Sequence, residues 1–334
     1  MRLHEAREVA SGASGRNGGF ALRGGAMPYD VAREQLGSKS AQEFWRLTEA
    51  GLDHLEKLAG DAFRRTGSLR LAADDDERDA LRREHDALVA DGFSVEWDEA
   101  LRPPLKGLYP AAVVHPTDGA LQPARWVRRL AQAAAEAGAE IREHSRVDLK
   151  ELEGEQVVVA TDGYGSGLLA ELDGAVRPTR GQVLVTEALP QLLFPRPHYA
   201  RHGFDYWQQT PDRRLVIGGS RDANLEAEFT DQEKTTPSVQ KRIEQFMGEL
   251  LSRPPRITHR WAGIFGTTSD NLPLAGRLPG SERVWLACGY SGHGNVLGLV
   301  CGELVAQAIL GQPRPELALF DPARLHRTGF RTKP

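Results

Sequence analysis

The sequence contains only two cysteines, Cys288 and Cys301, among 334 residues. So few thiols argue against a disulfide-stabilised secreted fold and favour a cytosolic protein, in which either thiol can be an ordinary core residue. No apolar run approaches the ~18 residues that a membrane-spanning helix needs, and the charged, then Gly-rich start does not read as a signal peptide. The formal net charge is −4 and the arginines are dispersed among acidic residues, so we expect no nucleic-acid partner.

Several catalytic and metal-binding patterns are also missing. His198 and His202 have the spacing of a zinc-binding helix, but the nearby Pro197 and Gly203 argue against a helix there, so we expect no metal. No Gly-x-Ser-x-Gly elbow occurs, because His293 stands where the second glycine would follow Ser291. A phosphate loop ending in Gly-Lys-Ser or Gly-Lys-Thr is absent as well.

The apolar periodicity predicts alternating helices and strands in a chain long enough for two domains. Ser40 and Glu43 form a capping-box pattern at the start of the first long helix. The acidic run at 74–77 is typical of a solvated helix N-terminus rather than a cation site. The short Val-rich run at 156–161 predicts a buried parallel strand. Helices are predicted at 40–58, 77–90, 123–137, from Pro237 onward and at 296–310, and further strands at 140–147, 181–186, 206–209, 215–219 and 284–287.

Two glycine-rich runs carry the strongest functional signal. The run from Ser11 to Gly19 combines small side chains with backbone N–H groups that can approach a phosphate or a flat ring closely. The run from Gly289 to Asn295 joins a predicted strand to a helix, so its free N–H groups lie at a positive helix end. Taken alone, the second run is equally consistent with an ordinary tight strand–helix connection.

Together with the turn at 160–163 and with Asp270, Pro273 and Gly276, these runs resemble the D-amino-acid oxidase family, most closely its gamma-glutamylputrescine oxidase branch. The resemblance covers nearly the whole chain. It implies FAD as cofactor and an α/β plus α+β fold, in which an incomplete Rossmann-like FAD-binding domain carries a mixed-sheet substrate domain. The implied boundaries are 1–25, 119–170 and 259–312 for the FAD-binding domain, 26–118 and 171–258 for the substrate domain, and 313–334 for a C-terminal tail.

The resemblance also implies the site residues. Tyr206 is expected to line the amine pocket, although a cross-strand aromatic pair explains it equally well, and His293 is expected to be a positioning residue near the flavin rather than a base. Glu5 is expected to hold the ribose, and Ser14 with Arg16 to face the pyrophosphate. The expected cofactor-binding residues are Glu5, Ser11, Ser14, Gly15, Arg16, Asn17, Gly18, Gly19, Val147, Thr161, Gly163, Gly289, Ser291, Gly292, His293, Gly294 and Asn295.

In that family a Gly-x-Gly-x-x-Gly turn precedes the ribose-binding acid by about 20 residues, whereas only four residues precede Glu5 here. We therefore expect the phosphate-binding turn to be absent, a strand edge to be left unpaired, and the chain as printed to bind FAD weakly or not at all. A misassigned start, a degraded gene and a partner chain that supplies the missing piece are the three explanations, of which we favour the first.

The implied activity is FAD-dependent oxidation of a small amine or amino acid. The imine product would hydrolyse to an aldehyde or keto compound, and dioxygen would reoxidise the flavin to give peroxide. A gamma-glutamylated diamine is the leading substrate. The alternatives are a non-catalytic remnant or subunit of a flavin oxidase, and a flavin dehydrogenase that passes electrons to another acceptor; the oligomeric state is left open.

Overall fold

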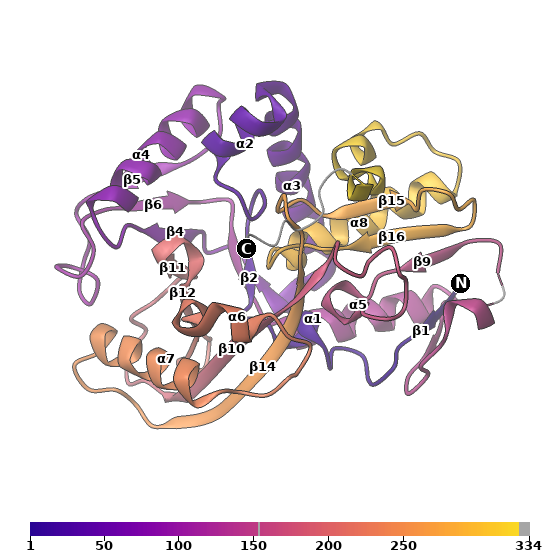
Figure 1. Ribbon diagram of the computed structural model, residues 1–334. Coiled ribbons are helices and arrows are strands. Elements are labelled where there is room, and N and C mark those ends of the chain that lie inside the picture. Colours follow the sequence, from indigo (N-terminus) through magenta and orange to yellow (C-terminus); the bar gives the residue numbers. More distant parts are fainter. Residues whose placement is uncertain (153, 327–334) are drawn as a thin grey trace.

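The computed structural model describes residues 1–152 and 154–326, and a long mixed sheet dominates them (Figure 1). The strand order in this sheet is β14-β10-β13-β12-β11-β4-β6-β5. All neighbouring pairs are antiparallel except β11 and β4, which run parallel. The strands are β4 Ser68–Leu71, β5 Glu96–Asp98, β6 Ala112–His115, β10 Arg177–Ala188, β11 His198–Ala200, β12 Asp205–Gln209, β13 Arg214–Gly219 and β14 Ile257–Thr267.

Helix α7, Pro237–Leu250, packs on one face of this sheet at the lower left of Figure 1. It begins where predicted, with Thr236 before a proline at the first helical position, which has no N–H to satisfy. Its apolar face buries Val239 and Ile243, and the Phe246 ring lies 5.2 Å from the Trp207 ring of β12, centroid to centroid. The helix thus covers the core of the predicted substrate domain.

The helices α2 Tyr29–Leu36, α3 Ser38–Ala59 and α4 Asp75–Ala90 lie at the top of Figure 1. The long α3 also packs against α8, Gly294–Ile309, through a close approach at Gly51, where a Cβ would lie 2.5 Å from the Val300 Cγ2. This contact links the N-terminal helices to the last strand–helix unit, so segments far apart in the sequence share one apolar core.

The predicted start signals of two helices are partly wrong. Helix α3 begins at Ser38 after Gly37, with no side-chain cap, so Ser40 and Glu43 form no capping box. At α4, Asp74 does cap the helix by accepting a hydrogen bond from the Glu77 N–H at 2.8 Å. Glu77 itself is buried rather than solvated. Its carboxylate accepts hydrogen bonds from the backbone N–H groups of Ala73, nearby in the sequence, and of Arg201 and His202, far along the chain.

Two small parallel ladders form beside the large sheet. β1 Arg2–His4 pairs with β8 Glu140–Arg142, and β9 Val157–Val159 pairs with β16 Val284–Cys288. The predicted parallel pairing of the Val-rich run is confirmed, but its burial is wrong, since Val158 is 45% exposed. Within the described residues β9 has a strand neighbour on one side only, so it is an edge strand of its small sheet. The remaining strands are β2 Phe20–Ala21, β3 Phe63–Arg64 and β7 Gly119–Leu121, which form one sheet, and β15 Leu274–Arg277, which pairs with β16.

The other elements are short or peripheral. The predicted helix at 123–137 is α5 Pro123–Glu136, whereas the predicted strand at 140–147 ends at Arg142 and leaves Val147 outside it. Two short helices are α1 Ala13–Arg16 and α6 Leu225–Glu228, and the 3-10 segments are η1 Gly60–Ala62, η2 Leu149–Glu151, η3 Asp162–Tyr164, η4 Arg201–Gly203, η5 Arg221–Asn224, η6 Pro315–Phe320 and η7 Pro322–His326. No helix in the described ranges is long and apolar enough to cross a membrane.

Part of the predicted C-terminal tail packs against the body of the protein. Phe320 of η6 is fully buried, and its ring centroid lies 5.5 Å from that of Phe44 in α3. Residues 327–334 of that tail lie outside the described residues. The mixed-sheet fold class is confirmed, and the domain boundaries remain a prediction. The predicted FAD-binding domain includes strand β14 from residue 259 onward, but this strand pairs with β10 of the large sheet up to Thr267.

Candidate active site

Reciprocal amide hydrogen bonds tie the two predicted glycine-rich runs together. The Asn17 Nδ2 donates to the Asn295 Oδ1 at 3.1 Å, and the Asn295 Nδ2 donates to the Asn17 Oδ1 at 3.0 Å. The Asn17 Oδ1 also accepts the Gly19 N–H at 2.9 Å, and the Asn295 Nδ2 also donates to the Phe20 carbonyl at 2.7 Å. The run at 11–19 and the run at 289–295 therefore meet at the start of α8.

Asp162 joins the third predicted segment to the same place. Its Oδ1 accepts the Gly289 N–H at 2.8 Å and the Tyr290 N–H at 3.3 Å, while its Oδ2 accepts the Gly266 N–H at 2.8 Å. Burial raises the pKa of this carboxyl group, and the N–H donors oppose the shift. The turn that follows β9 and the turn that follows β16 are thus held together by one side chain.

Tyr206 of β12 lies against the first glycine-rich run. A Cβ on Gly18 would lie 3.0 Å from the Tyr206 Cε2, and the Phe20 ring meets the Tyr206 ring edge-on at 5.7 Å. Tyr206 also stands opposite Tyr199 in the β11–β12 register, which fits the cross-strand aromatic pair, and its role in an amine pocket remains a prediction. Burial raises the pKa of Tyr206 to about 12, which keeps its hydroxyl protonated at neutral pH.

Phe265 of β14 connects the other two segments to this aromatic group. A Cβ on Gly163 would lie 2.6 Å from the Phe265 carbonyl carbon, and a Cβ on Gly292 would lie 3.8 Å from its ring. On the opposite side, a Cβ on Gly181 would lie 3.5 Å from the Phe265 ring and 3.9 Å from the Tyr206 hydroxyl. The predicted cofactor segments and the large sheet therefore meet at Tyr206 and Phe265.

Other predicted site residues lie elsewhere or have other partners. The Glu5 carboxylate accepts the Arg7 N–H at 2.8 Å, and the Ser11 hydroxyl accepts the Glu8 N–H at 3.4 Å. The Arg16 Nη1 lies 3.2 Å from the Glu233 Oε2, which also accepts a hydrogen bond from Arg7 at 2.6 Å. Val147 lies in the coil that follows β8. The roles of these residues toward a cofactor remain predictions.

Two buried polar atoms at predicted site residues have no hydrogen-bond partner among the described residues. They are the Thr161 Oγ1 and the His293 Nδ1. Most buried polar atoms in proteins find a partner, so these two atoms need an explanation, and a bound ligand is one. Desolvation and the nearby charges of Arg70 and Arg221 lower the pKa of His293 to about 4, so its imidazole is neutral at physiological pH.

Because the His293 imidazole is neutral in the folded protein, we expect the stability of the fold to depend on pH. The unfolded chain takes up a proton at His293 as the pH falls below 6.5, whereas the folded chain does so only near pH 4, so this group makes folding less favourable across that window. We expect the variant H293F to lose less stability than the wild type between these pH values, by up to about 1.4 kcal/mol per pH unit. Thermal melts of both proteins across the window measure this difference; parallel pH profiles would contradict a neutral His293.

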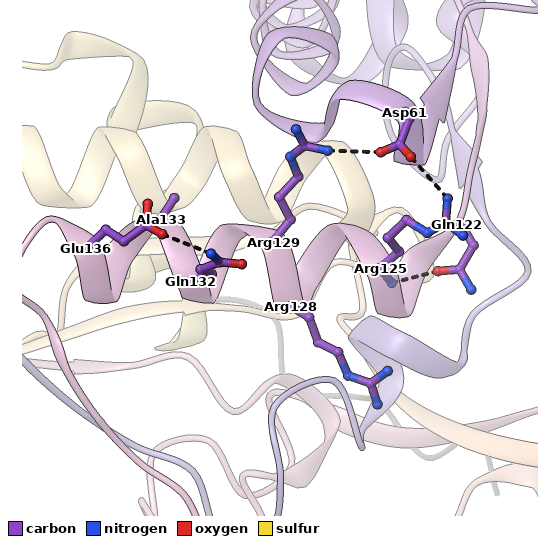
Figure 2. Close-up of a pocket in the computed structure, with 8 residues that line it drawn as sticks. All are labelled: Asp61, Gln122, Arg125, Arg128, Arg129, Gln132, Ala133 and Glu136. Carbon is purple, nitrogen blue, oxygen red and sulfur yellow. Dashed lines mark hydrogen bonds and ion pairs between the residues drawn. The ribbon is translucent and has the colours of Figure 1, made fainter.

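A separate polar depression lies on the surface of α5 (Figure 2). Arg125 and Arg129 project from this helix toward Asp61, with guanidinium nitrogen to carboxylate distances of 3.3 and 2.9 Å. None of the predicted cofactor residues lines it. Across the described ranges no group of three or more His, Cys, Asp or Glu side chains is placed to hold a metal, and His198 stacks on Trp207 at 5.2 Å.

The sequence of this chain matches a known protein family over most of its length. A family profile described as FAD dependent oxidoreductase (DAO) matches residues 2–308, which is most of the chain. The chain belongs to this DAO family. The predicted family is therefore confirmed, and membership makes the protein a flavoprotein oxidoreductase whose cofactor is FAD.

Three proteins illustrate the degree of similarity to this chain. A probable oxidoreductase OrdL from Haemophilus influenzae is 26% identical, covering 95% of this chain and 78% of that protein. The gamma-glutamylputrescine oxidoreductase of Escherichia coli is 24% identical, covering 92% and 77%. The crystal structure of glycine oxidase from Geobacillus kaustophilus superposes with a TM-score of 0.79 at 23% identity, covering 97% of this chain and 91% of that one.

Sequence reasoning missed two charged residues near this site. Glu233, which precedes α7, forms ion pairs with Arg7 and Arg16. Arg221 follows β13. Neither stands in a recognisable motif, since both lie in connections between elements. The one available signal was the positive charge of Arg16 within the glycine-rich run, which suggests that an acidic residue such as Glu233 pairs with it.

Proposed function

We propose that this DAO-family protein oxidises the C–N bond of a small amine or amino acid. The leading substrate is a gamma-glutamylated diamine, a choice that rests on the name of the Escherichia coli relative at 24% identity. The observation that carries the proposal is the meeting of the two glycine-rich runs and the turn at 160–163 with Tyr206 and Phe265 at one place.

The residues at this place suit a flavin. The unpartnered Thr161 Oγ1 and His293 Nδ1 offer hydrogen-bonding positions, and Gly18 leaves room where a side chain would crowd the Tyr206 ring. We propose that the segments 11–19, 161–163 and 289–295 hold FAD. When bound, FAD supplies the acceptor for the electron pair removed from the substrate carbon.

The chain's own contribution is to position the substrate amine and to exclude water. Tyr206, Phe20 and Phe265 form an aromatic surface, which lowers the pKa of a substrate amine and favours its neutral, oxidisable form. The neutral His293 can accept a hydrogen bond from that amine at its free Nδ1. The N–H groups at the start of α8 stabilise negative charge that develops beside them.

The test is anaerobic addition of candidate amines and amino acids to the protein with excess FAD, followed by admission of air. We expect one class of substrate to bleach the visible flavin band, and air to restore the band with release of peroxide. Bleaching that only an artificial acceptor reverses would identify a dehydrogenase. Bound flavin that no amine or amino acid bleaches would contradict the proposal and favour a non-catalytic protein.

A further inference from the structure

Glu233 lies in the connection between α6 and α7, and its carboxylate is the meeting point of three other side chains. The Arg7 Nη1 donates to the Glu233 Oε2 at 2.6 Å, and the Arg7 Nη2 donates to the Oε1 at 3.2 Å. The Arg16 Nη1 lies 3.2 Å from the same Oε2, and the Tyr164 hydroxyl donates to the Oε1. One acidic side chain therefore pairs with two arginines, one within the first glycine-rich run and one shortly before it.

This cluster lies directly against the backbone of the first glycine-rich run. A Cβ on Gly12 would lie 3.3 Å from the Tyr164 Cε2 and 3.4 Å from the Arg7 Nη2. The Arg7 guanidinium carbon in turn lies 5.3 Å from the centroid of the Tyr164 ring. An anion that binds this part of the run therefore meets the same donors that Glu233 already uses.

The cluster is charged and remains open to solvent. Burial alone would raise the pKa of Glu233, but hydrogen bonds from Arg7 and Tyr164 and the charge of Arg16 hold it below its usual value, so Glu233 is ionised at neutral pH. In these ion pairs two positive charges face one negative charge. The side chains of Arg7 and Arg16 are 42% and 34% exposed, so a dissolved anion can reach both guanidinium groups.

The ion pair between Arg180 and Glu228 differs in this respect. Its side chains are only 4% and 1% exposed, so no dissolved ligand can reach either charge without unfolding the surroundings. That pair is placed to stabilise the fold alone. The pairs of Glu233 are placed where solvent, the glycine-rich run and the connection 229–236 meet.

We propose that Glu233 is an internal anion that occupies Arg7 and Arg16 until a diphosphate group takes its place. The identification of that group as part of FAD rests on the proposed function. A diphosphate carries more negative charge than a carboxylate and offers oxygens to both guanidinium groups at once. Glu233 therefore holds the run in place before a ligand binds, and it competes with the ligand for the same donors.

The test uses inorganic pyrophosphate and the full chain, without flavin. We expect E233Q to bind pyrophosphate at least about tenfold more tightly than wild type in calorimetry, because a neutral amide competes less for the two arginines. Without pyrophosphate E233Q should melt at a lower temperature than wild type, and it should gain more from added pyrophosphate. A Glu233 that only stabilised the fold would instead lose both stability and affinity when replaced.

Two further variants complete the test. Y164F removes one donor from Glu233 and leaves both arginines, so it should tighten pyrophosphate binding by less than E233Q does. The matched control is D231N, which removes an exposed carboxylate from the same connection and should bind pyrophosphate as wild type does.

Melting curves identify which variants are folded. Pyrophosphate binding that is absent, unchanged or weaker in folded E233Q would overturn the inference, and so would equal tightening by D231N. If E233Q does not fold, unchanged or weaker binding by Y164F has the same consequence.

FAD separates this inference from the proposed function. If the run holds FAD, E233Q should also bind FAD more tightly than wild type. Tighter pyrophosphate binding by E233Q without FAD binding by either protein would preserve the role of Glu233 and defeat the proposed function. Amine oxidation by a wild type whose pyrophosphate affinity E233Q does not raise would defeat the role of Glu233 and leave the function standing.

Discussion

Replacing Gly19 by alanine should unfold much of the site at which the glycine-rich run meets the large sheet. Gly19 has a φ of +77°, and a Cβ there would lie 2.1 Å from the Leu121 carbonyl oxygen and 2.3 Å from the Gln208 Nε2. Because the carbonyl belongs to strand β7, it cannot move without breaking the sheet. We expect G19A to lose at least about 3 kcal/mol of unfolding free energy, measured by urea denaturation.

A matched control separates backbone strain from steric overlap. Gly37 has nearly the same φ, +82°, but a Cβ there would meet nothing within 4 Å. We expect G37A to cost only about 1 kcal/mol, the price of a positive φ in alanine. Equal losses of unfolding free energy in G19A and G37A would show that steric overlap with the Leu121 carbonyl does not contribute to the effect of G19A.

Removing the charge of Glu228 should produce the second large effect. Its carboxylate accepts hydrogen bonds from Arg180 at 2.9 and 2.7 Å and from the Gln182 Nε2 at 2.9 Å, and both charged residues are nearly inaccessible to solvent. The variant E228Q leaves the Arg180 charge buried without compensation. We expect a loss of about 3–5 kcal/mol in unfolding free energy, measured by the same denaturation method.

The neighbouring Glu226 provides the control for this prediction. It lies 3.4 Å from Arg177, and its side chain is 83% exposed, so solvent screens the pair. We expect E226Q to change stability by less than about 1 kcal/mol. A loss in E228Q as small as that in E226Q would mean that the buried pair does not hold α6 to strand β10.

Periodicity located most of the helices, because a helix that buries one face must repeat its apolar residues at a fixed spacing. The helix that opens at Pro237 and the final helix after the Gly-rich turn lie where this pattern predicts them. Helix caps and the solvent exposure of individual side chains were harder to predict. Glu77 is buried because residues 201 and 202, far along the chain, supply its hydrogen-bond donors.

The candidate site, like the fold, has features that the sequence predicts and features that depend on contacts between distant segments. The glycine-rich runs were visible because close backbone approach requires glycine at successive positions, and Asn17 and Asn295 lie within those runs. That the two amides bind each other could not be predicted, since the pairing depends on how two distant segments fold together. Arg221 stands in no motif, and its position near the Phe204 and Phe265 rings depends on how distant segments fold together.

The central claim is that three segments, the two glycine-rich runs and the turn at 160–163, hold FAD beside Tyr206 and Phe265. The most direct test is a titration of FAD with the protein, monitored by the quenching of flavin fluorescence. We predict saturable quenching, because the three segments meet at one place beside these two rings. The variant G19A should weaken the quenching, and G37A should leave it unchanged. Absence of saturable quenching, or equal quenching by G19A and wild type, would contradict the account.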